Sequence, residues 1–312
     1  MNILGKKTVR NVLSSIISIL TMFSVIITMG LVFFKTTLIN ENTYISVFEK
    51  IGTYDDIIES IDDNIGYTLV VHNIDKDILK GVISKEEVVD IIDSTTDSFI
   101  GFLKGKNSVL SYDKSKYEKR IDDAISKYLR DNGMYLTEIQ KIDIENIKTN
   151  LLNIIDSDLQ IINFEQLSKS NAMILVSKIV STIDNNMILV GLIVINIILL
   201  SLFFAIWKKR KARAYAWIGY TLVAAGLIVF LLSFSGYISK FYEYAIIAIP
   251  YVAKAVGSVI KKFLLNMSII SLVVTCTGIF SMSFYWKHLY KKYTKKSKYE
   301  KVEENSNIEV EY

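Results

Sequence analysis

The chain has 312 residues, of which 51% are hydrophobic and 22% are charged. A soluble domain contains about 45–50% apolar and about 25% charged residues, so these averages, with a mean hydropathy of +0.34, differ only modestly from those of a soluble protein. The apolar excess is concentrated in long uncharged runs. A single Cys excludes a disulfide framework and a thiolate metal cluster. One Pro and 14 Gly exclude collagen-like and Pro-rich disordered chains. The uncharged runs indicate a membrane protein.

Four uncharged runs are long enough to cross a bilayer as helices: 12–34, 187–207, 215–237 and 263–286. At about 1.5 Å per residue each run would reach about 31–36 Å, which exceeds the hydrocarbon core of about 30 Å. The first run could instead be a cleaved signal peptide. It is longer than a signal h-region, however, and no small-residue cleavage site follows Phe34. We therefore expect an all-α polytopic membrane protein with four transmembrane helices.

Basic residues near these runs predict the orientation. The N-terminus 1–11, the loop 208–214 and the tail 287–312 together carry 15 Lys and Arg, against 5 Asp and Glu that all lie in the tail. Four spans place these three segments on one side, which the positive-inside rule assigns to the cytoplasm. The region 35–186 and the loop 238–262 are then extracytoplasmic. We expect a multi-pass plasma-membrane protein with both termini in the cytoplasm.

The same side is expected to contact anionic lipid. Trp207 ends the second span, Trp217 begins the third and Trp286 ends the fourth, so all three indoles are predicted interface anchors. The loop supplies five candidates for binding anionic headgroups: Lys208, Lys209, Arg210, Lys211 and Arg213. The basic tail could bind RNA, but beside a membrane we favour lipid headgroups, and we expect no nucleic-acid partner.

The long region between the first two runs is predicted to be an acidic helical bundle. Residues 35–186 contain 17 Lys and Arg and 26 Asp and Glu, a net charge of −9. Ser84 and Glu87 form a capping-box pattern that opens a helix ending near Leu103. Apolar periodicity predicts further helices over 55–71, over 113–131, from about 137, and over 171–183. We expect a protein partner to bind through this acidic domain.

The loop 238–262 leaves two interpretations open. Pro250 is expected to break any helix there, and the residues from Tyr251 onward have one apolar and one Lys-rich face. This segment is either an amphipathic helix at the outer interface or an outward extension of the fourth span. We also hypothesise that Lys254, Lys261 and Lys262 dock onto the acidic domain.

No Asp, Glu, Lys, Arg or His lies inside the four runs, which argues against an ion-coupled pump. Asn196 lies in the middle of the second span and is expected to bond to a neighbouring helix. A set of small and hydroxyl residues lines one face of the fourth span: Ser268, Ser271, Thr275 and Gly278. This face predicts close helix packing, either among the four spans or between protomers.

Residues that carry chemistry are sparse. The chain lacks a phosphate-binding Gly-x-x-x-x-Gly-Lys loop, a Gly-x-Ser-x-Gly elbow and a His-Glu-x-x-His motif. The two histidines, His72 and His288, are predicted on opposite sides of the membrane, so they cannot share a metal. The acidic run Asp62-Asp63 lacks the Gly position and the closing Glu of a calcium loop. We expect no cofactor, no metal and no enzymatic activity.

Three short segments, 67–69, 73–77 and 82–88, resemble a recurrent pattern in uncharacterised four-span membrane proteins of low-GC Gram-positive bacteria. The resemblance implies a bacterial plasma membrane and an extracytoplasmic helical domain. The order of one span, an outer domain and three spans is also similar to FtsX-type and MacB-type ABC permeases, although the loop 208–214 is short and basic here. We expect an interaction or sensing module on a four-helix anchor. The alternative is an accessory or permease subunit of an ABC-type exporter.

Overall fold

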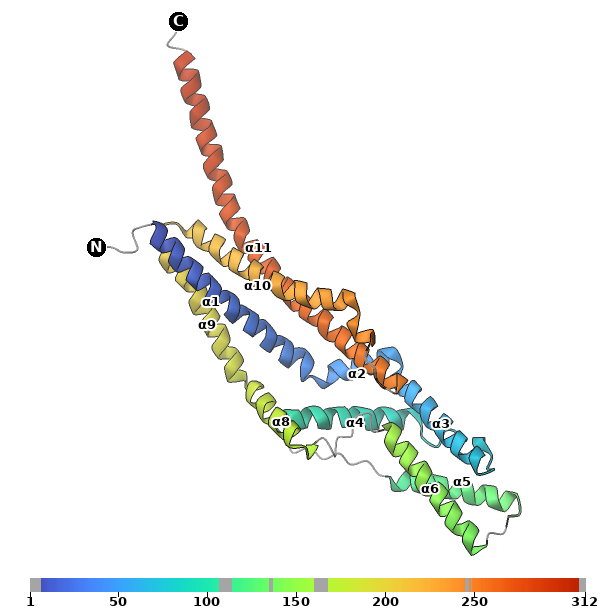
Figure 1. Ribbon diagram of the computed structural model, residues 1–312. Helices are drawn as coiled ribbons and strands as arrows, with labels where there is room; N and C mark the ends of the chain where they lie inside the picture. Colours follow the sequence, from blue (N-terminus) through green and yellow to red (C-terminus); the bar gives the residue numbers. More distant parts are fainter. Residues whose placement is uncertain are drawn as a thin grey trace. The chain divides into compact units, whose positions relative to one another are not determined.

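The computed structural model describes residues 7–106, 114–134, 137–159, 168–244, 247 and 249–308 (Figure 1). Within these residues the chain is helical and contains no strand. The chain divides into two compact units. Unit 1 consists of Met1–Thr36, Asn185–Ser239 and Phe263–Tyr312, and unit 2 consists of Thr37–Asp184 and Lys240–Lys262. The unit boundaries fall within two residues of the predicted ends of the apolar runs.

Among the residues that the structure describes, four helices are long and apolar enough to cross a membrane. They are α1 (Lys7–Phe33), α9 (Asn186–Ile206), α10 (Lys211–Ser239) and α11 (Pro250–Ile308). The helix α1 continues into a π-helical turn, Phe34–Leu38. In unit 1, α1 contacts both α9 and α10, and these two also contact each other.

The surface of unit 1 is apolar where a soluble protein would be polar. Along α1 the outward side chains include Val12, Ile16 and Phe23, which are 52–56% exposed. The buried side of the same helix contributes Ser14, Thr21, Val25 and Met29. A helix with hydroxyl groups inside and large apolar groups outside is typical of one surrounded by lipid, where apolar surface has no reason to avoid its solvent.

Small residues bring α10 and α11 into close contact. A methyl group added to Gly226 would lie 2.8 Å from the carbonyl oxygen of Ser271, and one added to Gly278 would lie 2.7 Å from the backbone nitrogen of Val223. The predicted face of α11 lies in this contact: Gly278 meets α10 directly, and the hydroxyl residues of that face, Ser268, Ser271 and Thr275, are all buried.

A hydroxyl pair adds to this contact, because Ser233 Oγ and Ser268 Oγ are 2.9 Å apart. Hydroxyl and glycine residues let two helix backbones approach closely enough for van der Waals contact between them. The small-residue face therefore packs within one chain.

The described part of unit 2 contains six further α-helices. They are α2 (Glu41–Ile51), α3 (Thr53–Val71), α4 (Lys85–Leu103), α5 (Ser115–Asp131), α6 (Glu138–Leu159) and α8 (Asn171–Ile183). Two 3-10 turns, Lys76–Leu79 and Phe241–Tyr244, join them in this unit. Gly52, at φ 72°, ends α2 and lets α3 begin at the next residue. The core is rich in Ile, with Ile57, Ile121 and Ile125 completely buried.

The capping box predicted at Ser84 is present. The Ser84 hydroxyl accepts a hydrogen bond from the Glu87 backbone N–H (3.3 Å), and Glu87 Oε2 accepts one from the Ser84 N–H (3.0 Å). The same carboxylate pairs with both terminal nitrogens of Arg120 on α5, at 2.8 and 2.9 Å, and with Lys116. One side chain thus caps α4 and joins it to α5. The hydrogen bond from Arg120 is the main reason that the pKa of Glu87 falls to about 2.

Pro250 does not interrupt a helix but is the first residue of α11, which continues without a break into the fourth span. A proline is tolerated in the first turn because its missing N–H would have no helical partner there. The segment from Tyr251 is therefore helical and continuous with the fourth apolar run. Its Lys254 Nζ lies 2.6 Å from Asp56 Oδ2 on α3, so one of the three lysines expected to dock onto the acidic domain does so.

Replacing Gly226 by Ala should destabilise unit 1, because the new methyl group would meet the backbone of α11 and overpacking of this kind costs about 1–3 kcal/mol. The apparent melting temperature in detergent, followed by size-exclusion chromatography, measures the effect. Gly191→Ala on α9 is the control, since nothing lies within 4 Å of the added carbon. Equal melting temperatures for the two variants would contradict the close contact.

Acidification should weaken unit 2 through Glu87. The pKa of this carboxyl is lowered by folding from 4.5 to about 2, so its contribution to stability is complete above pH 4.5 and is lost as the pH falls through about 2. The measurement is hydrogen exchange of the α4 backbone amides, corrected for the pH dependence of exchange in an unfolded peptide. The corrected rates should show that α4 unfolds locally more often at pH 3 than at pH 7. Glu87→Gln should reduce this pH dependence, whereas Glu86→Gln, an exposed neighbour, should retain it.

Candidate functional site

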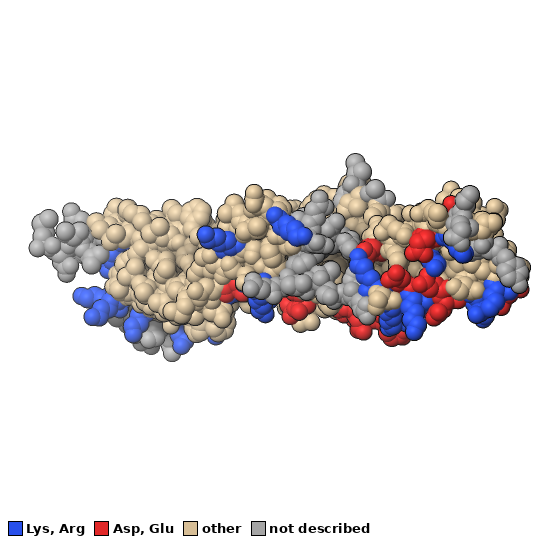
Figure 2. Space-filling model, turned by 90° about the horizontal axis from the view of Figure 1, so that it is seen from below, with Lys and Arg blue, Asp and Glu red and all other residues tan. Residues whose placement is uncertain are grey.

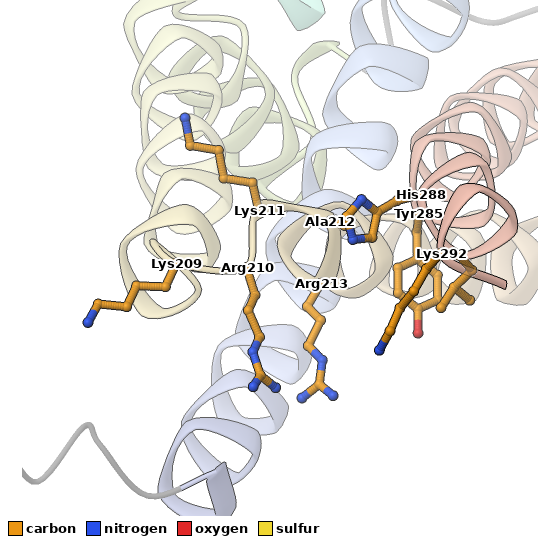
Figure 3. Close-up of a pocket in the computed structure, with 9 residues that line it drawn as sticks. Lys209, Arg210, Lys211, Ala212, Arg213, Tyr285, His288 and Lys292 are labelled. Carbon is orange, nitrogen blue, oxygen red and sulfur yellow. The ribbon is translucent and has the colours of Figure 1, made fainter. Parts of the chain in front are cut away.

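A basic hollow of about 520 Å³ lies in unit 1, where the connection between α9 and α10 meets α11 (Figure 3). Its lining residues come from these two segments: Lys209, Arg210, Lys211, Ala212, Arg213, Tyr285, His288, Leu289 and Lys292. Five of them are Lys or Arg and none is acidic. Among the described residues, no ion pair joins these five side chains to a carboxylate. In the part of the chain whose side chains are described, the hollow therefore carries a concentrated positive charge with no carboxylate beside it.

The connection between the helices is shorter than predicted. The sequence suggested a loop over 208–214, but α9 ends at Ile206 and α10 begins at Lys211. Two tight turns make the link, since the Arg210 N–H donates to the Trp207 carbonyl (2.7 Å) and the Arg213 N–H donates to the Arg210 carbonyl (2.8 Å). Lys211 and Arg213 consequently occupy the first turn of α10. Unsatisfied N–H groups and the helix dipole already make that end positive.

Trp207 holds this region together from inside. Its indole is 1% exposed, and its Nε1 donates a hydrogen bond of 2.9 Å to Ser14 Oγ on α1. The guanidinium carbons of Arg213 and Arg10 lie 5.1 and 5.4 Å from the centre of the indole ring. These are cation–π distances. The sequence predicted an interface anchor at Trp207, and the structure places its ring inside the packing of α1, α9 and α10.

The wall of the hollow on α11 continues the face that packs on α10. Ser281 Oγ donates to the Tyr215 carbonyl at 3.0 Å, one turn before Tyr285. His288 and Lys292 follow at helical spacing on the same side. In Figure 3 Arg210, Arg213 and Lys292 extend toward the same side of the hollow, while Lys209 and Lys211 extend away from them. The close helix contact thus places an α11 lysine beside the start of α10.

The other predicted residues lie outside the hollow. Lys208 is exposed, Trp217 packs partly buried against the unit 1 core, and Trp286 is 53% exposed. Asn196 is buried, and its Nδ2 donates to Thr28 Oγ1 on α1 at 2.8 Å and to the Leu192 carbonyl at 3.0 Å. This amide therefore links α9 to α1.

Sequence reasoning missed Tyr285, His288 and Lys292 as partners of the basic connection. Their spacing of three and four residues, in register with the small residues earlier on α11, was the available signal. Elsewhere, the described residues contain no group of three His, Cys, Asp or Glu that could hold a metal ion. His72 belongs to unit 2 and His288 to unit 1.

No protein-family model matches the sequence, and no match is found among curated proteins or solved structures. The function must therefore be argued from the arrangement of the residues themselves.

Substituting Trp207 by Phe should lower the melting temperature of the solubilised protein, because the Ser14 hydroxyl loses its partner and the weaker ring attracts the two arginines less. We expect a loss of about 1–3 kcal/mol from the unpaired buried group. Trp286→Phe is the matched control, since that indole is largely exposed. If Trp286→Phe were as destabilising as Trp207→Phe, the structural role assigned to Trp207 would be wrong.

Proposed function

We propose that the protein is a multi-pass plasma-membrane protein in which unit 1 is a four-helix anchor and unit 2 an extracytoplasmic interaction module. The four long apolar helices of unit 1 support insertion. The positive-inside rule supports the orientation, because the basic connection and both termini would then face the cytoplasm and its anionic lipid headgroups.

Charge separates the two units. Unit 1 has no Asp or Glu before Glu300, so every red side chain in Figure 2 belongs to unit 2. Figure 2 shows these acidic groups crowded together with basic ones, while much of the remaining surface is uncharged. A charged exterior on unit 2 is compatible with water, and the uncharged exterior of unit 1 with lipid. This contrast supports the assignment of an anchor and a water-exposed module.

The observation that carries the interaction role is an apolar patch on unit 2, which we call the α3 patch. It consists of Tyr67, Val70 and Val71 near the end of α3, which are 74%, 54% and 58% exposed. Charged residues surround it, and a hollow of about 320 Å³ lies beside it, with Asp63 and Lys76 in its lining. Exposed apolar side chains rimmed by charge mark protein-binding surfaces, and Tyr is enriched in them.

A second exposed apolar surface has a different explanation. On α8, Ile174, Leu175, Val176 and Ile179 are 40–59% exposed. This helix ends at Ile183, directly before α9 begins at Asn186. In the proposed topology it lies next to the outer membrane interface, where apolar side chains contact lipid. The α3 patch is not adjacent in sequence to any span, so lipid does not account for it.

The exporter alternative has less support. In the permeases that the span order resembles, the connection between the second and third spans couples to an ATPase. Here that connection is Trp207 to Arg210, and Trp207 is buried. Only the two turns between the helices are left to form such a contact.

Photo-crosslinking in whole cells tests the interaction role. A benzophenone amino acid at Tyr67 should give a discrete protein adduct, whereas the same group at Lys127, an exposed residue of α5, should not. Val70→Asp should abolish the adduct from position 67 by placing a charge in the patch, without changing the amount of protein in the membrane. Identical adducts from both positions, or an adduct unaffected by Val70→Asp, would argue against the α3 patch as the binding surface.

A further inference from the structure

We propose that the basic hollow of unit 1 is a binding site for one phosphomonoester group, a dianion held between the start of α10 and α11. The inference rests on the proposed membrane insertion only for the source of the ligand. It does not depend on the interaction role of unit 2.

The first argument is charge. Five Lys and Arg line the hollow, and the unit 1 segments that form it, 185–239 and 263–299, contain no Asp or Glu. Lys211 and Arg213 also stand in the first turn of α10, at the positive end of its dipole, where cations are unfavourable. This accumulation is stabilised when an anion occupies the hollow. Within 185–239 and 263–299 no carboxylate is available to supply that anion, and the first one on α11 is Glu300.

The second argument is the match between donors and ligand. Arg210, Arg213 and Lys292 extend toward one side of the hollow (Figure 3), so two guanidinium groups and an ammonium group gather near the start of α10. Guanidinium groups pair with phosphate oxygens through two parallel hydrogen bonds, and helix N-termini bind phosphate through backbone N–H groups. Tyr285 and His288 add further polar groups to the same lining.

The charge of the ligand distinguishes a phosphomonoester from a phosphodiester. A phosphomonoester carries about −1.5 to −2 at pH 7 because its second pKa is about 6, whereas a phosphodiester carries a single charge. Three cations that extend toward one side, with two more in the lining, favour the more highly charged group. A zwitterionic headgroup would bring a cation into the hollow and is disfavoured.

The third argument is that the site is held in place. Arg213 lies over the buried Trp207 ring at 5.1 Å, and Ser14 fixes that ring through its indole N–H. The α11 wall is held by Ser281 and by the Gly278 contact with α10. The donors therefore come from the α9–α10 connection, from α10 and from α11, which are held together by these contacts. A basic surface that only attracts anions, such as the one around the exposed Lys208, does not need its side chains fixed by such contacts.

Two sources could supply the group: a lipid with a phosphomonoester headgroup, or a soluble phosphate ester. The purified full-length protein is placed in three kinds of phosphatidylcholine nanodisc. One contains about one phosphatidic acid in ten lipids, one contains phosphatidylglycerol in the same proportion, and one contains no anionic lipid. Native mass spectrometry then counts the retained lipid. Glycerol phosphate, added to phosphatidylcholine nanodiscs, tests the soluble source.

The decisive variants differ in position but not in charge. The pair Arg210→Gln and Lys292→Gln removes two lining cations, while Lys208→Gln and Lys291→Gln removes two neighbouring cations that do not line the hollow. We expect one phosphomonoester lipid per chain, a loss of affinity of about tenfold or more for the first pair, and a change below about threefold for the second. A soluble ester that binds with the same dependence on the variants would assign the site to a free metabolite phosphate.

Equal losses for the two pairs would overturn the proposal, because they would show diffuse attraction without a discrete site. Binding of phosphatidylglycerol as tight as that of phosphatidic acid would overturn the preference for a dianion, and the absence of any retained phosphate would overturn the site. None of these results bears on the crosslink at Tyr67. The two proposals therefore fail separately.

Discussion

The close approach of α10 and α11 is the constraint on which the rest of unit 1 depends. Gly226 and Gly278 face the opposite backbone so closely that a methyl group would not fit without a shift. If unit 1 is surrounded by lipid, as we propose, no hydrophobic force favours one helix contact over another, so such fitting surfaces and buried hydroxyl pairs must specify the arrangement. The consequence reaches beyond the contact itself, because the same face of α11 continues to His288 and Lys292. Packing in the apolar part thus sets the geometry of the basic hollow.

A second constraint joins the hollow to the first helix. The buried Trp207 donates a hydrogen bond to Ser14 on α1. Its ring also makes cation–π contacts with Arg10 on α1 and Arg213 on α10. Burying an indole N–H without a partner is costly, so the Ser14 hydroxyl is needed as the acceptor for the Trp207 N–H. The result is a short connection closed by two turn hydrogen bonds instead of the longer basic loop that composition alone would predict. Such fixed geometry is what the proposed anion site would need to differ from a surface that attracts any anionic lipid.

Much of the architecture follows from local patterns in the sequence. Uncharged runs predicted the four long helices, and the Ser84 and Glu87 pattern predicted the start of α4, because hydropathy and capping depend on residues close in the chain. The start of α10 at Lys211 was missed because charged residues mark the edge of an apolar run, not the end of a helix. The burial of Trp207 was missed for a related reason. Residue type favours an interface for Trp, but only packing decides which way it faces.

The hollow itself was beyond local reasoning, since its two walls are about 80 residues apart in the chain and meet only through the α10–α11 contact. In the same way Lys254 was predicted to meet the acidic domain, yet its partner Asp56 could not be chosen among many acidic residues until α3 and α11 were placed. Charge patterns predict which surfaces attract each other. Three-dimensional packing determines the residue pairs.

Cysteine accessibility in intact cells tests the central claim, that unit 1 spans the membrane with the hollow inside and unit 2 outside. The single native cysteine is exposed on α11 and is first replaced by Ser, Cys276→Ser. A membrane-impermeant maleimide should then label a cysteine placed at Ser115 on α5 without permeabilisation, and one placed at Lys209 only after permeabilisation. Labelling at 209 in intact cells, or protection at 115, would contradict the account.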